Sequence, residues 1–307
     1  MRLPFFFHVM KFGLALSGGG ARGFFHIGVL KSLARFGIRP DAVAGTSIGA
    51  VIGGMYALDP DPFRLEQKIF RIFRKHRKGI GVLKNYSASS SVEEKKIFLE
   101  KSYEFVKDLF LWNLHIIKPY LVDPAPFIRI MRDLFGSARF AHCRIPFFCT
   151  GVDLRTGSAV VLDQGSVARS VTASCAFPGF FPPIEIDQQE LVDGGVLLPL
   201  PAQVLKERGY WVVGVNADNK EEFAQQKKNA VEILFLTEKI RHREILAKNL
   251  ESADFLISAE LENVLWVDFD RAPDLVAIGE EVGDEYGRRL MRTFRKERIK
   301  RFFTFRR

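Results

Sequence analysis

Two glycine-rich turns stand within the first fifty residues, and each joins a short apolar run to a stretch of helical length. The first joins residues 12–16 to residues 24–36, and the second joins residues 42–44 to residues 48–58. The apolar spacing predicts a strand followed by a helix in both places. Two strands separated by one helix form a βαβ unit, in which the strands are parallel. The sequence therefore predicts a parallel sheet at the core of the fold.

The alternation of strands and helices resumes after residue 146. The runs FFCTGVDL and SAVVL, joined by Arg155, Thr156 and Gly157, predict a hairpin. Further along, the patterns predict strands at 211–215 and 255–258 and helices at 167–177, 201–208 and 231–250. We find no internal repeat, so one α/β domain is the simplest organisation.

Two segments depart from this alternation. Residues 59–144 are irregular, basic and aromatic, which predicts a helical cap or lid inserted into the domain. The net charge of +9 is concentrated at residues 292–307, where eight Lys or Arg face one Glu. We therefore predict one domain over residues 1–290, which contains the insertion, and a basic aromatic tail over residues 291–307. A chain of 307 residues, 47% hydrophobic, is long enough for one such domain with a large core.

The strongest chemical signal is a G-x-S-x-G pattern at the second strand-to-helix turn, formed by Gly45, Ser47 and Gly49 with Thr46 and Ile48 between them. A serine on such a tight turn presents its hydroxyl group, and small flanking residues let the strand and the helix approach closely. The N–H groups at the start of the following helix favour negative charge that develops there. In this setting the pattern points to Ser47 as a nucleophile.

The first turn, SGGGARG at 17–23, supports two interpretations. Gly18, Gly20 and Gly23 satisfy the G-x-G-x-x-G fingerprint that binds the pyrophosphate of a dinucleotide. That interpretation also requires an acidic residue at the end of the second strand, where this chain has none. The alternative is an oxyanion hole of backbone amides, which lies beside Ser47 because adjacent parallel strands end at the same edge. The second interpretation uses both turns.

A serine nucleophile requires a base, and two residues compete for that role. His242 would complete a serine, aspartate and histidine triad, but it lies in EKIRHREIL, a charged helical surface. Asp193 ends a short apolar run and precedes Gly194 and Gly195, which suits either a turn or a carboxylate presented to a site. The remaining histidines lack a position in a loop after a strand, and they are His8, His26, His76, His115 and His142.

Four motifs, in this order, resemble those of the patatin-like phospholipases: SGGGARG at 17–23, GTSIG at 45–49, ASCAFPGFFPP at 173–183 and DGG at 193–195. The likeness extends to ADFLIS at 253–258 and covers most of the chain outside the insertion and the tail. The resemblance implies a three-layer α/β/α fold with a mainly parallel central sheet. It also implies hydrolysis of lipid esters, of the phospholipase A or lysophospholipase kind, by a serine–aspartate dyad without a histidine.

By the same resemblance, Ser47 is the nucleophile and Asp193 the base. The residues implied for the oxyanion loop are Gly18, Gly19, Gly20, Arg22 and Gly23, and the flanks of the two catalytic residues are Gly45, Gly49, Gly194 and Gly195. Arg22 either meets a lipid phosphate or is a structural arginine bonded to neighbouring carbonyls. Two other classes of function remain open at this point: a dinucleotide-binding or regulatory α/β module, and a lipid-binding protein with a vestigial site.

The tail and the composition bear on partners and location. The tail alternates cations with phenylalanines, which favours an anionic membrane surface over nucleic acid. Three cysteines without a C-x-x-C pair argue against a disulfide framework and a zinc site and suit a reducing compartment. No apolar run of membrane-spanning length and no signal peptide is expected. We thus expect a cytoplasmic protein, peripheral at the inner membrane surface, that needs no cofactor and no metal.

Overall fold

The fold is given by a computed structural model, which describes residues 11–77, 122–218, 230–261 and 264–304. Its centre is an eight-stranded sheet in the order β5-β6-β3-β2-β1-β7-β8, with β4 paired to β3. The parallel strands are β1 (Phe12–Leu16), β2 (Ala42–Gly45), β3 (Phe147–Asp153), β7 (Trp211–Asn216) and β8 (Phe255–Ser258). The antiparallel strands are β4 (Ser158–Leu162), β5 (Ile184–Ile186) and β6 (Gln189–Asp193).

The central strands are apolar along their whole length because both faces of the sheet are covered. Every residue of β1 and β2 is buried, as expected for parallel strands between two layers of helices. The two strands pair in register, and their last pair is Leu16 with Gly45. Their carboxyl ends therefore meet at one edge of the sheet, which brings the glycine loop after β1 beside the turn that contains Ser47.

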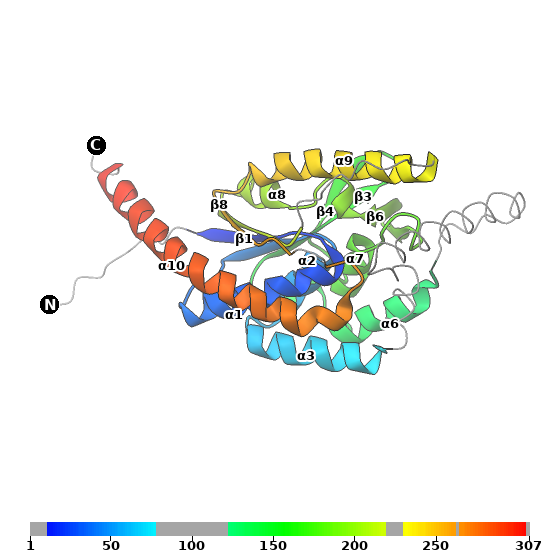
Figure 1. The fold of residues 1–307 in the computed structure, drawn as a ribbon, viewed down its shortest axis with the longest axis horizontal. Coiled ribbons are helices and arrows are strands. Elements are labelled where there is room, and N and C mark those ends of the chain that lie inside the picture. Colours follow the sequence, from blue (N-terminus) through cyan, green and yellow to red (C-terminus); the bar gives the residue numbers. More distant parts are fainter. Residues whose placement is uncertain (1–10, 78–121, 219–229, 262–263, 305–307) are drawn as a thin grey trace, which may run out of the picture.

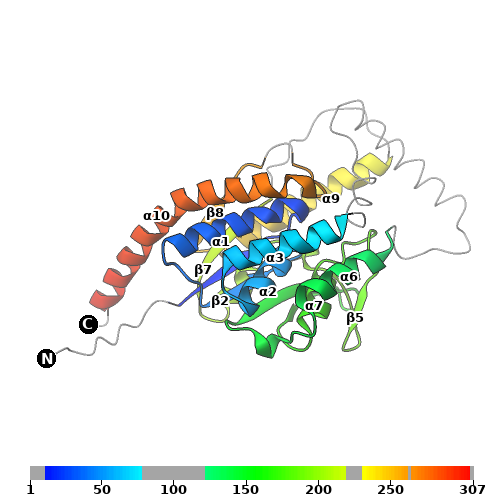
Figure 2. The ribbon, with the colours of Figure 1, turned by 90° about the horizontal axis from the view of Figure 1, so that it is seen from below.

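Helices form a layer on each side of the sheet (Figure 1 and Figure 2). One layer contains α1 (Phe25–Arg35), α2 (Ile48–Leu58), α3 (Pro62–Lys75), α6 (Pro124–Phe135), α7 (Val167–Ser174) and α10 (Ala272–Thr304). The other contains α8 (Ala202–Lys206) and α9 (Ala230–Leu250). The short 3₁₀ helices are η1 (Gly20–Phe24), η2 (Phe140–His142), η3 (Gly194–Val196) and η4 (Phe269–Arg271). The three-layer α/β/α fold with a mainly parallel sheet, predicted from the sequence, is confirmed.

Helices α1 and α10 lie side by side, and glycines set their separation (Figure 2). A Cβ atom added at Gly28 of α1 would lie 2.0 Å from the Val276 carbonyl oxygen of α10. One added at Gly279 of α10 would lie 2.2 Å from the Phe25 carbonyl oxygen. Only glycine at these positions allows the two backbones to approach this closely.

The predicted boundary between residues 290 and 291 falls inside α10, which continues to Thr304. Phe294, at the start of the predicted tail, packs against Phe12 and Trp211, with ring centroids 5.2 and 5.4 Å apart. The first turns of the predicted tail therefore pack against the α/β body. Among the described residues, no helix combines the length and the apolar composition that crossing a bilayer requires.

The two described ends of the predicted 59–144 insertion are helices packed into the main core. Helix α3 buries Leu65, Ile69 and Ile72, and α6 buries Leu134 and Phe135 with their neighbours. Residues 78–121, between these helices, lie outside the described residues. The division into domain, insertion and tail stays a prediction.

The structure adds one hairpin that the sequence did not predict, between β5 and β6. Asp187 and Gln188 connect these strands with φ values of 48° and 65°. Two-residue turns with positive φ usually contain Asn or Gly, so Asp-Gln gives a weak turn signal. The predicted hairpin of β3 and β4 is confirmed.

Candidate active site

Ser47 lies on the sharp turn between β2 and α2. Its φ and ψ are 54° and −124°, a conformation that residues with a side chain rarely adopt. The flanking glycines are required by close contacts: a Cβ at Gly45 would lie 2.3 Å from the Gly49 carbonyl oxygen, and one at Gly49 would lie 2.3 Å from that of Leu16. The G-x-S-x-G pattern is therefore a consequence of how tightly the helix crosses the ends of the two strands.

Asp193 ends β6, which pairs with β3, the neighbour of β2. Its side chain is buried, and one carboxylate oxygen accepts a 2.7 Å hydrogen bond from the N–H of Gly195. A Cβ at Gly194 would lie 2.2 Å from the Thr150 hydroxyl oxygen, and one at Gly195 would lie 3.1 Å from an Asp193 carboxylate oxygen, so close contacts restrict both positions of the D-G-G motif.

The Ser47 hydroxyl group lies close enough to the Asp193 carboxylate to affect its pKa. Burial raises the pKa of Asp193 to about 6, although the hydrogen bond from Gly195, the Ser47 hydroxyl and the nearby His242 act in the opposite direction. Desolvation dominates because the carboxylate has left water almost completely. The result is a carboxylate in contact with a serine hydroxyl and more basic than an exposed aspartate.

The glycine loop passes directly beside Ser47. A Cβ at Gly18 would lie 3.6 Å from the Ser47 Cβ, and one at Gly23 would lie 2.2 Å from Ile48 Cγ2. The loop is tied down by the N–H of Gly18, which donates to the Pro199 carbonyl at 3.0 Å. The absence of a side chain at Gly23 thus lets η1 pack closely against α2.

Two N–H groups of this loop are available to a ligand. Gly19 and Gly20 have positive φ values of 131° and 60°. The N–H of Ala21 donates to the Trp266 carbonyl at 2.7 Å, whereas those of Gly19 and Gly20 have no acceptor in the described parts of the chain. Such paired backbone donors are the usual components of an oxyanion hole.

The side chain of Arg22 contacts both the glycine loop and Asp218. Its Nε donates to the Gly19 carbonyl at 3.2 Å, and its Nη2 lies 2.8 Å from an Asp218 carboxylate oxygen. This geometry matches the structural interpretation of Arg22, an arginine bonded to a neighbouring carbonyl.

The histidines lie in four different settings. His242 pairs with Asp218 at 2.6 Å, and its ring contacts neither member of the Ser47–Asp193 pair through a hydrogen bond that the structure describes. His26 is fully buried; its Nε2 donates to the Ser17 carbonyl at 2.9 Å, and burial lowers its pKa to about 4. His76 pairs with Asp133, and His142 accepts from the Arg139 N–H. His8 and His115 lie outside the described residues.

Several residues of the site were not found from the sequence. The Ser174 hydroxyl accepts a hydrogen bond from the Ser47 N–H, and the Thr46 hydroxyl bonds Thr150 at 2.7 Å and the Leu198 carbonyl at 2.6 Å. The Cys175 side chain lies near the Ser47 hydroxyl, and burial raises the pKa of this thiol well above its ordinary value. A signal for Ser174 and Cys175 existed in ASCAFPGFFPP, where small residues end a helix next to the site. Among the described residues, no cluster of His, Cys, Asp or Glu could hold a metal ion.

Aromatic side chains lie next to these loops. Phe177, Phe180 and Trp266 pack with ring centroids 5.1 to 5.7 Å apart, and Phe177 is 48% exposed. Two backbone hydrogen bonds connect the cluster to the site. The Trp266 carbonyl accepts one from the N–H of Ala21, and the carbonyl of Ala176, which precedes Phe177, accepts one from the N–H of Asp193 at 3.0 Å. It combines apolar surface with proximity to the serine.

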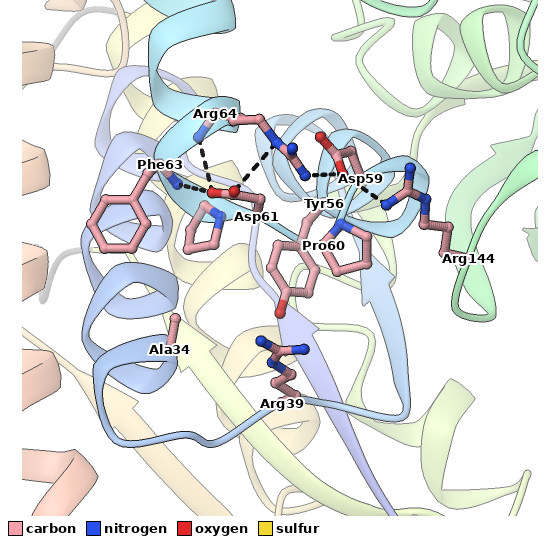
Figure 3. Close-up of a pocket in the computed structure, with 10 residues that line it drawn as sticks. Ala34, Arg39, Tyr56, Asp59, Pro60, Asp61, Phe63, Arg64 and Arg144 are labelled. Atoms are coloured by element: carbon pink, nitrogen blue, oxygen red, sulfur yellow. Dashed lines mark hydrogen bonds and ion pairs between the residues drawn. The ribbon is translucent and has the colours of Figure 1, made fainter.

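A cavity of about 550 Å³ lies elsewhere, at the far end of α2 from Ser47 (Figure 3). Arg39 and Tyr56 face each other across it, and Asp59, between Arg64 and Arg144, forms ion pairs with both at 2.8 and 3.2 Å. The 11 residues of α2 place this cavity roughly 16 Å from the serine turn. None of the motif residues lines it.

Comparisons with known proteins agree on one family. The model of the family described as patatin-like phospholipase matches residues 14–206. Lysophospholipase NTE1 of Candida albicans is 32% identical over 197 residues, which are 64% of this chain and 12% of that protein. An uncharacterised NTE family protein of Mycobacterium tuberculosis is 31% identical over 193 residues, 63% of this chain and 28% of that protein. The match thus spans less than a third of the length of these relatives.

Among solved structures, the crystal structure of VipD from Legionella pneumophila is similar to this chain. It is 17% identical, covers 92% of this chain and 67% of its own, and superposes with a TM-score of 0.49.

Proposed function

This chain belongs to the patatin-like phospholipase family, and from that premise we propose that it is a serine acyl hydrolase of lipid esters, of the phospholipase A or lysophospholipase kind. One observation carries the proposal: the Ser47 hydroxyl, on a strained turn, lies beside a buried Asp193 whose pKa burial raises to about 6. A base of this strength, in contact with the hydroxyl it must deprotonate, is what nucleophilic catalysis by serine requires.

In the proposed reaction, Ser47 Oγ attacks the acyl carbonyl carbon while Asp193 accepts the hydroxyl proton. The tetrahedral intermediate collapses by breaking the bond to the alcohol oxygen, which takes the proton from Asp193 and leaves. Loss of the alcohol leaves the acyl group bound to Ser47 Oγ as an ester. A water molecule, deprotonated by Asp193, attacks this ester, releases the fatty acid and restores the serine.

The N–H groups of Gly19 and Gly20 are the proposed donors to the oxyanion. They belong to a loop in contact with Ser47 and lack other acceptors in the described parts of the chain. Removing one such donor typically slows an acyl-transfer enzyme by about 10²–10³-fold. The aromatic cluster of Phe177, Phe180 and Trp266, in which Phe177 is exposed, is the proposed contact surface for the acyl chain.

We also propose that the basic end of α10 meets anionic headgroups, with the enzyme peripheral at the inner surface of a membrane. The support is the clustering of cations and phenylalanines in RKERIKRFFTFRR at 295–307.

The test is covalent labelling of the serine by a fluorophosphonate probe, together with hydrolysis of a soluble short-chain ester. Wild-type protein should label and hydrolyse, Ser47→Ala should do neither, and Asp193→Asn should lose hydrolysis. His242→Ala should still be labelled and should hydrolyse the ester far faster than Ser47→Ala or Asp193→Asn, because His242 does not accept the serine proton. Full activity in Asp193→Asn with loss in His242→Ala would support a histidine triad instead, and saturable NAD binding without labelling would support a dinucleotide module. Lysophospholipid, phospholipid and neutral glyceride vesicles then define the head group.

A further inference from the structure

A chain of three ionisable side chains connects α9 to the glycine loop. Asp218 lies 2.8 Å from Arg22 Nη2 through one carboxylate oxygen and 2.6 Å from His242 Nε2 through the other. Arg22 and Asp218 are 13% and 11% exposed, so little water screens their ion pair. A bridge of this kind between a largely buried arginine and a largely buried carboxylate is shorter and stronger than a surface pair.

Arg22 connects Asp218 to the backbone of the glycine loop. The same guanidinium that pairs with Asp218 donates through Nε to the Gly19 carbonyl. An arginine can bind both partners at once because its donors form a rigid planar fork. The carbonyl oxygen of one residue and the N–H of the next point in opposite directions across a trans peptide. Fixing the Gly19 carbonyl on Arg22 therefore also fixes the direction of the Gly20 N–H.

The segment that carries Asp218 runs beside the glycine loop. The Ala217 N–H donates to the Ser17 hydroxyl at 2.9 Å, and the Asp218 N–H donates to the Asn216 side chain at 3.1 Å. A Cβ at Gly19 would lie 3.4 Å from the Ala217 carbonyl oxygen. The end of β7 thus holds Asp218 at a set distance from the loop that β1 leads into.

We propose that Asp218 is a positioning residue for the oxyanion hole, acting through Arg22, and that His242 is its second support. The proposal rests on the proposed function, because it assigns a task in the same reaction. Asp218 touches none of the reacting atoms; through Arg22 and the Gly19 carbonyl it sets the orientation of the N–H donor at Gly20. Since glycines with positive φ are otherwise free to rotate, the loop needs such an external restraint. His242, the competitor for the role of base, receives a different role.

The main test compares hydrolysis of a soluble short-chain ester by Asp218→Ala, Arg22→Ala and the double variant. A misplaced donor weakens the transition state and not the substrate complex, so kcat of Asp218→Ala should fall by about 10–100-fold with KM nearly unchanged. The double variant should be no slower than Arg22→Ala, because Asp218 acts only through Arg22. Arg22→Lys should stay slow, since its single nitrogen cannot occupy both the Nε position that meets the carbonyl and the Nη2 position that meets the carboxylate.

Lys206→Ala provides a matched control. It removes an ion pair of 2.7 Å with Asp254, on the far side of the sheet from α1, and should leave kcat unchanged. Asp218→Asn keeps the shape of the side chain and loses its charge, so it keeps the test valid if the alanine variant unfolds. Fluorophosphonate labelling of each variant should slow in proportion to kcat.

Two results would overturn the inference. One is a wild-type kcat in both Asp218→Ala and Asp218→Asn, and the other is rate losses of Asp218→Ala and Arg22→Ala that multiply in the double variant. Ser47→Ala separates this failure from that of the proposed function. An inactive Ser47→Ala beside a fully active Asp218→Ala contradicts the positioning role alone, whereas an active Ser47→Ala contradicts the dyad.

Discussion

The backbone N–H of Ser47 donates a hydrogen bond of 3.0 Å to the hydroxyl oxygen of Ser174. Ser174 is the last residue of α7 and is fully buried, so a neighbouring helix holds the serine turn in place. Ser174→Ala leaves this N–H without an acceptor, which should lower the free energy of unfolding by about 1–3 kcal/mol. Urea unfolding measures that loss, and fluorophosphonate labelling should slow. Thr172→Val is the control, because its hydroxyl bonds only the Ala168 carbonyl of the same helix in the described structure; equal slowing in both variants would contradict the assignment.

The strained backbone of Ser47 predicts that glycine is more stable there than alanine. Glycine adopts a φ of 54° without steric cost, whereas alanine keeps the strain. We expect the free energy of unfolding, measured in urea, to be about 1 kcal/mol higher for Ser47→Gly than for Ser47→Ala, with both variants inactive. Ala277, exposed on α10, provides the control. Ala277→Gly should lower the free energy of unfolding by about 1 kcal/mol, because glycine destabilises a helix. Equal stability of the two Ser47 variants would show that the turn is relaxed.

The pKa of Asp193 predicts the acid limb of the pH profile. The carboxylate must be ionised to accept the serine proton, and its pKa is about 6. The kcat/KM of a soluble ester should therefore be level above pH 7 and fall about tenfold per pH unit well below 6. A profile that stays level down to pH 5 would mean that another group is the base.

The same burial predicts that Asp193→Asn stabilises the fold. The pKa of Asp193 rises from an ordinary value of 3.8 to about 6, so ionisation above pH 6 opposes folding by about 3 kcal/mol. The asparagine variant should therefore be more stable than wild type at pH 8, and the difference should shrink as the pH falls from 6 to 4. Urea unfolding at pH 8, 6 and 4 measures this trend. A variant that is less stable at pH 8 would contradict it.

The packing of Phe294 determines how the basic end of the chain should be removed. Deleting residues 291–307 would also remove Phe294 from its contacts with Phe12 and Trp211, so the deletion should begin at residue 297. We expect the shortened protein to bind anionic vesicles more weakly, by about 1 kcal/mol for each cation that meets the surface. Its hydrolysis of a soluble ester should equal that of the full chain. Unchanged vesicle binding would remove the tail from the proposed membrane contact.

The parts of the fold that the sequence predicts are those with local causes. A strand buried on both faces gives a continuous apolar run, so 12–16 was predicted with the bounds it has as β1. The short apolar run at 255–258 likewise has its predicted bounds as the edge strand β8. The proximity of the two glycine turns followed from parallel strands ending together. The pairing of Asp193 with Ser47 was implied by the family resemblance, because Asp193 alone fits an ordinary turn equally well.

The supporting residues could not be predicted because their signals are not local. Asp218 follows β7 and meets Arg22 only because β7 and β1 are neighbours in the sheet. The Trp266 carbonyl, which accepts a hydrogen bond from the Ala21 N–H, lies in an irregular segment, and no sequence spacing predicts that these two residues meet. The extent of α10 was hidden by composition: its last turns are so basic that they suggested a separate tail, although the backbone stays helical to Thr304.

The burial of His26 changes the number of protons that the protein releases when it folds. Its neutral imidazole is buried against the Ser17 carbonyl, and its Nδ1 has no hydrogen-bond partner among the described residues. With a pKa lowered from 6.5 to about 4, His26 releases a proton on folding between these pH values, and stability is lost as the pH falls through them. Asp193 takes up a proton on folding between pH 3.8 and 6. The two effects, each about 3 kcal/mol, oppose one another, so together these residues leave stability nearly independent of pH across the acid range in which activity is lost.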